Sequence, residues 1–259
     1  MFKIRASGCG HITAGTIGLT GKQTIELEGL EVKEKRTDKQ TEKMDSLIHK
    51  RDNPKLPQGA KTFCKDWLKE QIYNRRKEFS NKYTEKGHIT EDNSIDFIAD
   101  HLDYGMLMKN EERKESEFMT GECDVVQPDH IIDVKNSWSW DTFPLLETEI
   151  PNMDYYWQGQ VYMHLWDKPK YKLIYVLSDT PIHLIEKEAY WWCKNNGYEE
   201  LEMSIYDKFI AKMTYPDIPN EHKIKVYEFD RNEKDIEEII KRVKLCREYI
   251  DELKEINKL

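Results

Sequence analysis

The sequence predicts a mixed α/β fold, with a small central β-sheet flanked by helices and a long helix at its C-terminal end. Three observations support this prediction. Short apolar runs at 116–126 and 130–136 follow each other closely, and the run at 172–177 has the composition of a buried strand. Helical periodicity fills segments between these runs. Residues 231–257 repeat apolar side chains on one face of a charged segment, which predicts the long helix.

The first 58 residues give a weaker signal for regular structure. Residues 23–27 read Gln-Thr-Ile-Glu-Leu, and this alternation predicts a short strand or hairpin within a loop. Residues 31–58 are charged and contain Pro54 and Pro57, so we expect an exposed arm there.

Two helices are expected between this arm and the first strands. The first covers 59–80, and its apolar stripe consists of Phe63, Trp67, Leu68, Ile72 and Phe79. Thr90, followed by Glu91 and Asp92, has the pattern of an N-cap. The helix that it predicts carries Ile95, Phe97, Ile98 and Leu102.

The C-terminal half alternates helices and strands. The expected elements are a helix at 152–166, a strand at 172–177, helical structure at 184–213 with a break at Gly197, a strand at 224–229 and the helix at 231–257.

Size and composition favour a single cytoplasmic domain. A chain of 259 residues can bury one sizeable core. We expect residues 1–58 to form an N-terminal segment, 59–180 the core and 181–259 a C-terminal helical extension. No apolar run approaches the length of a membrane span, and the start lacks the pattern of a signal peptide. The five cysteines are scattered and odd in number, which argues against a disulfide framework.

The net charge of −9 disfavours binding of nucleic acid through overall charge. Lysine and arginine nevertheless gather at 33–39, 49–55 and 61–77, while acidic residues concentrate at 111–122 and in the tail. The composition is therefore compatible with a locally basic groove.

The most informative pattern joins Asp124 to Asp133-Val134-Lys135. Side chains alternate along a strand, so Asp133 and Lys135 point to one side, and pairing of the two runs would bring Asp124 beside them. Two carboxylates and an ammonium group in one small volume suit a hard cation such as Mg²⁺. The alternative is an exposed salt-bridge ladder on an antiparallel pair.

These residues resemble the signature of the restriction-endonuclease-like superfamily of metal-dependent nucleases, which is Asp, a spacer, Asp or Glu, any residue, and Lys. Cys123 stands where many members have proline. Residues 155–163, Tyr-Tyr-Trp-Gln-Gly-Gln-Val-Tyr-Met, are similar to the glutamine-containing helix of RecB-type and lambda-type exonucleases. Segments 4–12 and 82–91 resemble the lambda-type, YqaJ-like phage exonucleases in particular.

The resemblance covers residues 1–180 and implies a restriction-endonuclease-like core with a Mg²⁺-dependent DNA exonuclease activity, in which Mn²⁺ can substitute. Some RecB-type relatives hold an iron–sulfur cluster on closely spaced cysteines, and because this chain lacks that spacing we expect no such cluster. The implied metal ligands are Asp124, Asp133, the carbonyl of Val134 and Glu91.

The resemblance also implies roles for residues that do not hold the metal. Lys135 would lie near the attacking water, where its charge stabilises the phosphate as it is cut. Gln158 would contact metal-bound water or the scissile phosphate, with Tyr162 beside it, because residues four apart share a helix face. A helix that merely packs its apolar face in the core is the alternative.

The upstream acidic ligand is the least defined part of the site. An acidic residue at a helix start is favoured by the helix dipole whether or not it binds metal. The competitors of Glu91 are Glu85, Asp92, Glu111, Glu112 and Glu115. His88 is a possible further ligand, since RecB-type relatives carry a histidine in this region.

Aromatic residues crowd the segment after Lys135. Trp138, Trp140 and Tyr155 would form a rim on which unpaired bases of DNA stack, although such residues also serve as core.

The expected substrate is DNA, as duplex ends or single strands, in phage recombination or DNA processing. A single-strand annealing protein and a homo-oligomer are possible partners. The alternatives are a structure-specific or single-strand endonuclease with the same site, a non-catalytic DNA-binding accessory protein, and an unrelated acidic α/β protein.

Overall fold

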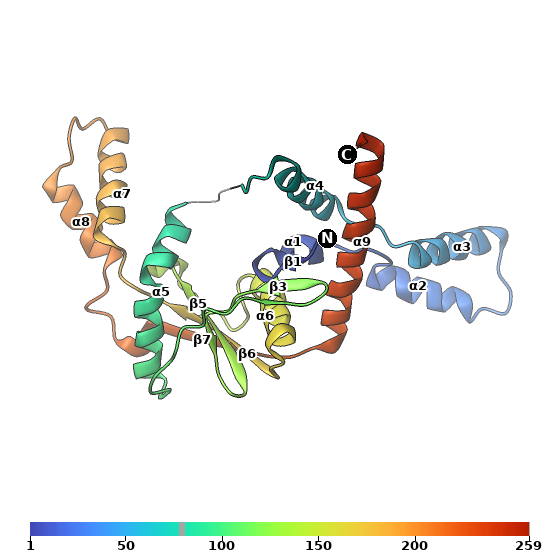
Figure 1. The fold of residues 1–259 in the computed structure, drawn as a ribbon, viewed down its shortest axis with the longest axis horizontal. Coiled ribbons are helices and arrows are strands. Elements are labelled where there is room, and N and C mark those ends of the chain that lie inside the picture. The colour runs from blue at the N-terminus through green and yellow to red at the C-terminus, as the bar shows by residue number, and fades with distance from the viewer. Residues whose placement is uncertain (78–80, 259) are drawn as a thin grey trace.

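A four-stranded mixed sheet lies between two helices in the computed structural model, which describes residues 1–77 and 81–258 (Figure 1). The strand order is β4 (Val125–Val126), β5 (His130–Asn136), β6 (Lys170–Val176) and β7 (Ile224–Asp230). The central pair β5–β6 is parallel, and both outer pairs are antiparallel. The central strands therefore end side by side at one edge of the sheet.

The two faces of this sheet pack against different helices. Ile132 and Val134 of β5 point to the face covered by α5 (Lys82–His101), where Ile98 is fully buried. Ile131 points to the opposite face, which is covered by α6 (Met153–Trp166). This alternation leaves Asp133 and Lys135 on the α6 side.

A second sheet leads directly to Asp124. Its order is β1 (Ile4–Arg5), β3 (Met119–Gly121) and β2 (Lys114–Glu115), with β1 and β3 parallel. The chain continues from β1 through the 3₁₀ turn Ala6–Gly8 into α1 (Cys9–Thr13), which packs on α6. The predicted strand at 116–126 is therefore two short strands, interrupted just before β4.

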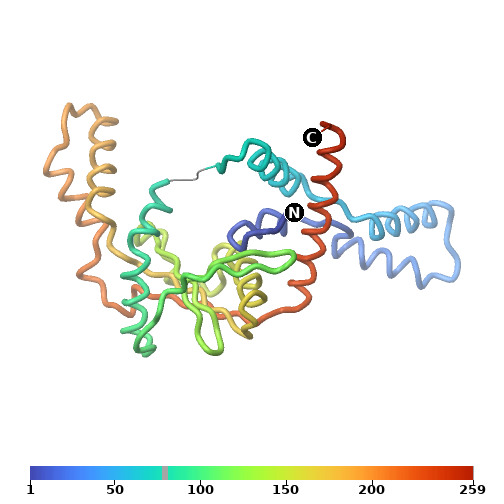
Figure 2. The backbone as a smooth tube through the Cα atoms, in the orientation of Figure 1, coloured from blue at the N-terminus to red at the C-terminus, as the bar shows by residue number. Residues whose placement is uncertain are grey.

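Further helices surround this centre. The helix α4 (Gln58–Tyr73) packs against the C-terminal helix α9 (Glu233–Asn257). A hairpin of α7 (Ile182–Asn195) and α8 (Met203–Met213) projects at one end of the molecule. The hairpin of α2 (Gly21–Glu31) and α3 (Asp38–Asp52) projects at the opposite end, as the tube in Figure 2 shows. Short 3₁₀ turns cover Trp140–Thr142 and Asn220–His222.

The prediction of a strand at 23–27 is wrong, because these residues belong to the helix α2 (Gly21–Glu31). Thr20 and Gln23 form a capping box at its start. Leu27 and Leu30 are buried, whereas Ile25 is exposed. The spacing of the buried leucines is helical, and the alternation that suggested a strand does not correspond to burial.

The segment 31–58, expected as an exposed arm, is largely exposed, but it contains the helix α3 (Asp38–Asp52), which was not predicted. A second capping box, made by Thr37 and Gln40, starts it. Leu47 is buried against α2 in a small apolar cluster. The charged side chains that suggested an arm line the outside of this helix.

Two helix boundaries also differ from the prediction. Thr90 is no N-cap: Asn81 caps α5, and Thr90 lies inside the helix, where its hydroxyl donates to the carbonyl of Lys86 at 2.8 Å. The first long helix ends at Tyr73, before the predicted end at 80, and Asn74 closes it in a left-handed conformation. Phe79 lies outside the described residues.

The remaining elements confirm the predicted fold class. The helix at 152–166, the strands at 172–177 and 224–229, and the long C-terminal helix appear within a few residues of their predicted bounds. The helical region 184–213 is divided around Gly197 into α7 and α8. All five cysteines are buried and free. In the described part of the chain, no helix has the length and apolar character needed to span a membrane.

Close packing between α6 and β6 leaves no room for a side chain at Gly159. An added Cβ would lie 2.3 Å from Cδ1 of Tyr171, which is itself fully buried. We expect Gly159→Ala to lower the free energy of unfolding by about 1–3 kcal/mol, measured by urea unfolding. Gly29→Ala is the control, because its Cβ would meet nothing within 4 Å in α2. An equal effect of both substitutions would contradict this account of the packing.

Candidate active site

Asp124 lies just before β4 and reaches across to the neighbouring strand. Val125 pairs with Ile132, so Asp124 is opposite Asp133 in the antiparallel ladder. Oδ2 of Asp124 accepts the backbone N–H of Val134 at 2.6 Å. The predicted pairing of the two runs is confirmed, and it places the two carboxylates opposite each other where β4 begins to pair with β5.

Asp133 and Lys135 form a short ion pair on the α6 side of β5. The ammonium of Lys135 is 2.5 Å from Oδ2 of Asp133, and the Asp133 side chain is only 1% exposed. The same ammonium lies 5.0 Å from the ring centre of Tyr155. The pair predicted from the sequence is therefore present. Its carboxylate is buried and its lysine is 22% exposed, so the pair is not part of an exposed ladder.

The helix α6 contributes an amide and a hydroxyl to the same volume. Nε2 of Gln158 donates to the hydroxyl of Tyr162 at 2.8 Å and approaches Oδ1 of Asp133 at 3.4 Å. Both residues are buried. Gln160 points elsewhere and donates to the carbonyl of Asp230. The four-residue spacing of Gln158 and Tyr162 thus does place them together beside Asp133.

Burial and crowding strongly affect protonation in this cluster. Burial, together with the nearby Asp133 carboxylate, raises the pKa of Asp124 to about 7. Burial opposes the charge of Lys135, but Asp133 and Asp124 hold the pKa of this lysine above its usual value. Burial also raises the pKa of Tyr162 well above its usual value. Lys135 therefore stays charged and Tyr162 stays neutral at neutral pH.

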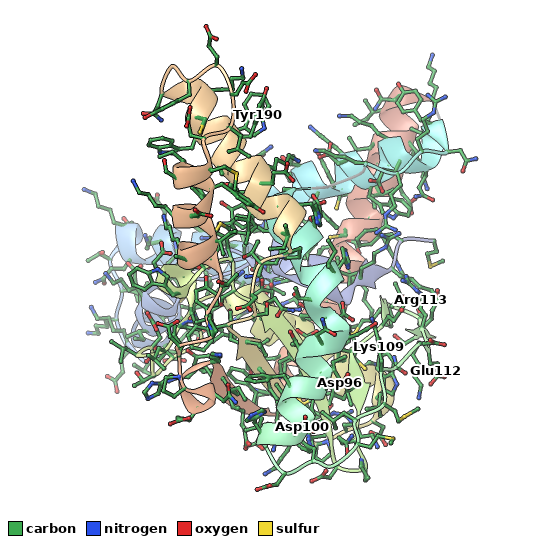
Figure 3. The ribbon with its side chains drawn as sticks, turned by 90° about the vertical axis from the view of Figure 1, so that its left-hand side faces the viewer. Asp96, Asp100, Lys109, Glu112, Arg113 and Tyr190 are labelled. Atoms are coloured by element: carbon green, nitrogen blue, oxygen red, sulfur yellow. The ribbon has the colours of Figure 1, made fainter. Side chains whose placement is uncertain are left out.

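Glu91 lies near this cluster but has another partner. Its carboxylate adds to the raised pKa of Asp124, so the two groups are close. The ammonium of Lys109 is 3.0 Å from Glu91 and 2.7 Å from Asp92. Lys109 lies beside α5 in Figure 3 and forms a β-bridge with Val125. Lys109 thus links α5 to the strand that follows Asp124.

The donor atoms suit a hard divalent cation. Oδ1 of Asp124 accepts no hydrogen bond from the described residues. Burial and the nearby Asp133 carboxylate both raise the pKa of the Asp124 carboxyl, and a bound cation would oppose both effects. The donors are carboxylate and carbonyl oxygens, which Mg²⁺ prefers. Within residues 1–77 and 81–258 no three His, Cys, Asp or Glu side chains are already grouped tightly enough to hold a metal. A third carboxylate would have to move toward Asp124.

The other expected site residues differ in their placement. His88 is exposed on α5 and has no hydrogen bond or ion pair with any described residue. Trp138 is half-buried against Tyr83, and Trp140 is 58% exposed. Tyr155 borders the site directly through Lys135. The structure thus brings Tyr155 to the cluster, while the two tryptophans follow the end of β5.

Sequence reasoning missed Lys109 and Tyr171. Tyr171 is fully buried, and the nearby Asp133 carboxylate adds to the effect of burial in raising its pKa. An apolar strand that contains a tyrosine gives no sign of this contact. Lys109 lies in a loop without periodicity, and only the tertiary fold brings it to Glu91.

Several solved structures that resemble this fold are exonucleases. A phage-related exonuclease from Haemophilus somnus 129PT matches with a TM-score of 0.70 and 26% identity, over 97% of this chain and 95% of that chain. The alkaline exonuclease from Laribacter hongkongensis matches with a TM-score of 0.57 and 10% identity, over 99% of this chain and 91% of that chain. Its complex with dAMP matches with a TM-score of 0.53 and 12% identity, over 99% and 93% of the two chains.

These structures confirm the expected fold class and the resemblance to phage exonucleases. The likeness extends over nearly the whole chain, including the C-terminal part where the sequence shows no matching motif. No protein-family model and no curated protein matches the sequence.

The raised pKa of Asp124 predicts a pH-dependent penalty in the metal-free protein. The unfolded carboxyl loses its proton near pH 4 and the folded one near pH 7, so this group makes folding less favourable as the pH rises between these values. We expect Asp124→Asn to be more stable than the wild type by about 1–4 kcal/mol at pH 8, and by much less at pH 4. Urea unfolding in EDTA measures both differences.

Asp129→Asn is the control for this experiment, because the Asp129 carboxyl is exposed and its hydrogen bond to His130 lowers its pKa. This substitution should not produce a gain that grows with pH. A gain for Asp124→Asn that is equal at pH 4 and pH 8 would contradict the assignment.

Proposed function

We propose that this chain, which shares its fold with phage-related and alkaline exonucleases, is a metal-dependent DNA exonuclease that hydrolyses phosphodiester bonds. The carrying observation is the meeting of Asp124, Asp133 and Lys135 where β4 and β5 begin to pair, with the Asp133 carboxylate almost fully buried. A protein that only binds DNA needs no buried cluster of this kind, because contacts to phosphate suffice for binding.

The residues of the cluster have different roles in the proposed hydrolysis. Asp124, Asp133 and the carbonyl of Val134 would hold Mg²⁺ or Mn²⁺, and Glu91, whose charge adds to the raised pKa of Asp124, would be the third carboxylate. A bound divalent cation would supply a polarised water and neutralise charge on the phosphate. Lys135 keeps its proton, so it acts through its positive charge and not as a base.

Gln158 and Tyr162 orient this arrangement. The amide of Gln158 spans the distance between Asp133 and the Tyr162 hydroxyl, so it fixes the carboxylate relative to α6. Because Tyr162 remains neutral, it adds no negative charge beside Asp133 at alkaline pH. We expect the exposed ring of Trp140 and the rim residues Trp138 and Tyr155 to contact bases of the DNA.

A locally positive groove compensates for the acidic character of the whole chain. Arg5 has a lowered pKa because of burial and because Arg76 and Arg113 lie close to it. A cavity of about 570 Å³ is lined by Arg5, Arg76, Ser7 and His11 among others. Arg5 pairs in register with Thr120 of β3, four residues before Asp124. This groove is where we expect the phosphates of the DNA to bind.

The likeness to a phage-related exonuclease also supports a proposal for the biological role. We propose a role in phage-type recombination or DNA processing, with a single-strand annealing protein as partner of the enzyme and assembly into a homo-oligomer.

Lys135→Ala tests the catalytic cluster. Removing the charge should lower the rate of DNA cleavage by at least about 10²-fold while leaving DNA affinity within a few fold, because the phosphate groove is intact. Cleavage rates and filter-binding affinities in Mg²⁺ give both quantities. Lys172→Ala on β6 is the matched control, since Lys172 lies on the other face of the sheet and pairs with Glu228. Wild-type cleavage by Lys135→Ala would exclude the assigned role.

Linear and covalently closed circular DNA distinguish an exonuclease from an endonuclease built on the same site. We expect the purified protein to degrade linear duplex DNA in Mg²⁺ or Mn²⁺, to leave the circle intact, and to lose activity in EDTA. Nicking of the circle would support the endonuclease alternative. Absence of metal-dependent cleavage of either DNA would support the non-catalytic alternative.

A further inference from the structure

Lys86 is a fully buried lysine outside the residues assigned to the site. Its ammonium donates to the carbonyls of Trp138 at 3.0 Å and Ser178 at 2.7 Å. These carbonyls lie just beyond the ends of the parallel strands β5 and β6. Burial lowers the pKa of Lys86 to about 8, and Asp179 opposes this effect. A buried charge without a carboxylate in contact is unfavourable, so its persistence indicates a specific structural requirement.

Lys86 belongs to a polar stripe of α5 that contacts the ends of these strands. Thr90 and Ser94 follow Lys86 at intervals of four residues and share its helix face. Ser178 donates its hydroxyl to that of Thr90 at 3.4 Å. The Ser94 hydroxyl donates to the side-chain oxygen of Asn136 at 2.6 Å. The three positions therefore fix the rotation and the height of α5 over the sheet.

The neighbouring face of α5 carries Glu91. This side chain is 22% exposed, whereas Asp92, which shares Lys109, is 77% exposed. Glu91 contributes to the raised pKa of Asp124, and Lys109 bridges to Val125, the residue after Asp124. The direction of Glu91 thus depends on how α5 is seated on the strand ends.

We propose that Lys86 is a positioning residue of the metal site. By tying α5 to the ends of β5 and β6, it keeps Glu91 where this carboxylate can exchange its ion pair with Lys109 for a cation at Asp124 and complete the oxygen ligands. Substitution of a residue that orients a metal ligand commonly lowers the metal affinity by about 10- to 100-fold. The inference rests on the proposed function, and it selects Glu91 from the acidic residues near the start of α5.

Binding of Mn²⁺ to the full, metal-stripped chain tests this role without DNA cleavage. We expect Lys86→Met to weaken Mn²⁺ binding by about 10-fold or more in titration calorimetry, at a temperature where circular dichroism shows the variant folded. If Lys86 acts through Glu91, the same substitution made in a Glu91→Gln background should weaken binding by less than about twofold.

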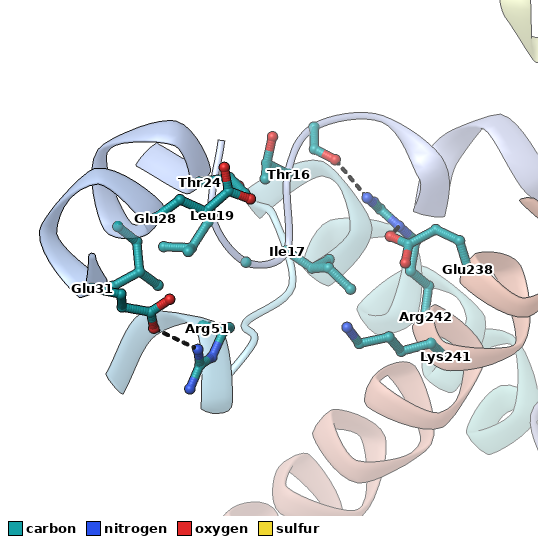
Figure 4. A pocket seen from close by; sticks show the side chains of 13 residues that line it. Thr16, Ile17, Leu19, Thr24, Glu28, Glu31, Arg51, Glu238, Lys241 and Arg242 are labelled. Atoms are coloured by element: carbon teal, nitrogen blue, oxygen red, sulfur yellow. Dashed lines mark hydrogen bonds and ion pairs between the residues drawn. The ribbon is translucent and has the colours of Figure 1, made fainter. Parts of the chain in front are cut away.

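Arg242→Met is a matched control for the loss of a buried cation. Arg242 is also buried, and its guanidinium donates to the carbonyls of Ile12 and Gly15, each at 2.8 Å. It lies beside Glu238 and Lys241 at a cavity of about 460 Å³ at the base of α2, which none of the proposed site residues lines (Figure 4). This variant should lose stability but keep the Mn²⁺ affinity of the wild type.

Two results would overturn the proposal. One is an Mn²⁺ affinity of Lys86→Met equal to that of Arg242→Met. The other is a loss of affinity in the Lys86→Met, Glu91→Gln double variant that equals the product of the losses in the two single variants. If Lys86→Met does not fold, Ser94→Ala takes its place, with a smaller loss of affinity and the same dependence on Glu91 expected. If the proposed function itself is wrong, the measurements differ from both of these results. The wild type would then bind no Mn²⁺, or Asp124→Asn would bind it unchanged.

Discussion

Two carboxylates, Asp124 and Asp133, share one ammonium group in the interior of the protein, and the surrounding structure holds them in place. The Asp133 carboxylate is buried against Lys135, whose side chain is 22% exposed, and within the described part of the chain Asp124 accepts one hydrogen bond, from the backbone N–H of Val134. Burial raises the pKa of Asp124, and the negative charge of Asp133 adds to this effect. Such a site destabilises the metal-free fold and becomes favourable when a cation binds.

The apolar packing on each face of the sheet offsets the free-energy cost of these buried charges. On one face, α6 packs so closely on β6 that Gly159 contacts the ring of Tyr171, and the same helix supplies Gln158 to Asp133. On the other face, α5 buries Ile98 against β5 and uses Lys86 to hold the strand ends. Both helices therefore combine apolar burial with polar contacts that orient the cluster.

Local patterns predicted which residues of the candidate site lie together. The alternation of β5 and the four-residue spacing of Gln158 and Tyr162 depend only on the geometry of a strand and a helix. The sequence could not reveal Lys109 or Lys86, because their partners lie in distant segments and are chosen by packing. The helices α2 and α3 were missed for a related reason: their few buried leucines stabilise each other only as a pair.

The central claim is that Asp124 and Asp133 bind a divalent cation beside Lys135. A crystal structure of the chain soaked in Mn²⁺, with anomalous scattering recorded for manganese, tests it most directly. The account predicts an anomalous peak within about 2.1 Å of carboxylate oxygens of both aspartates, as expected for a small hard cation. A fully occupied manganese site elsewhere, with no peak at these two carboxylates, would contradict it.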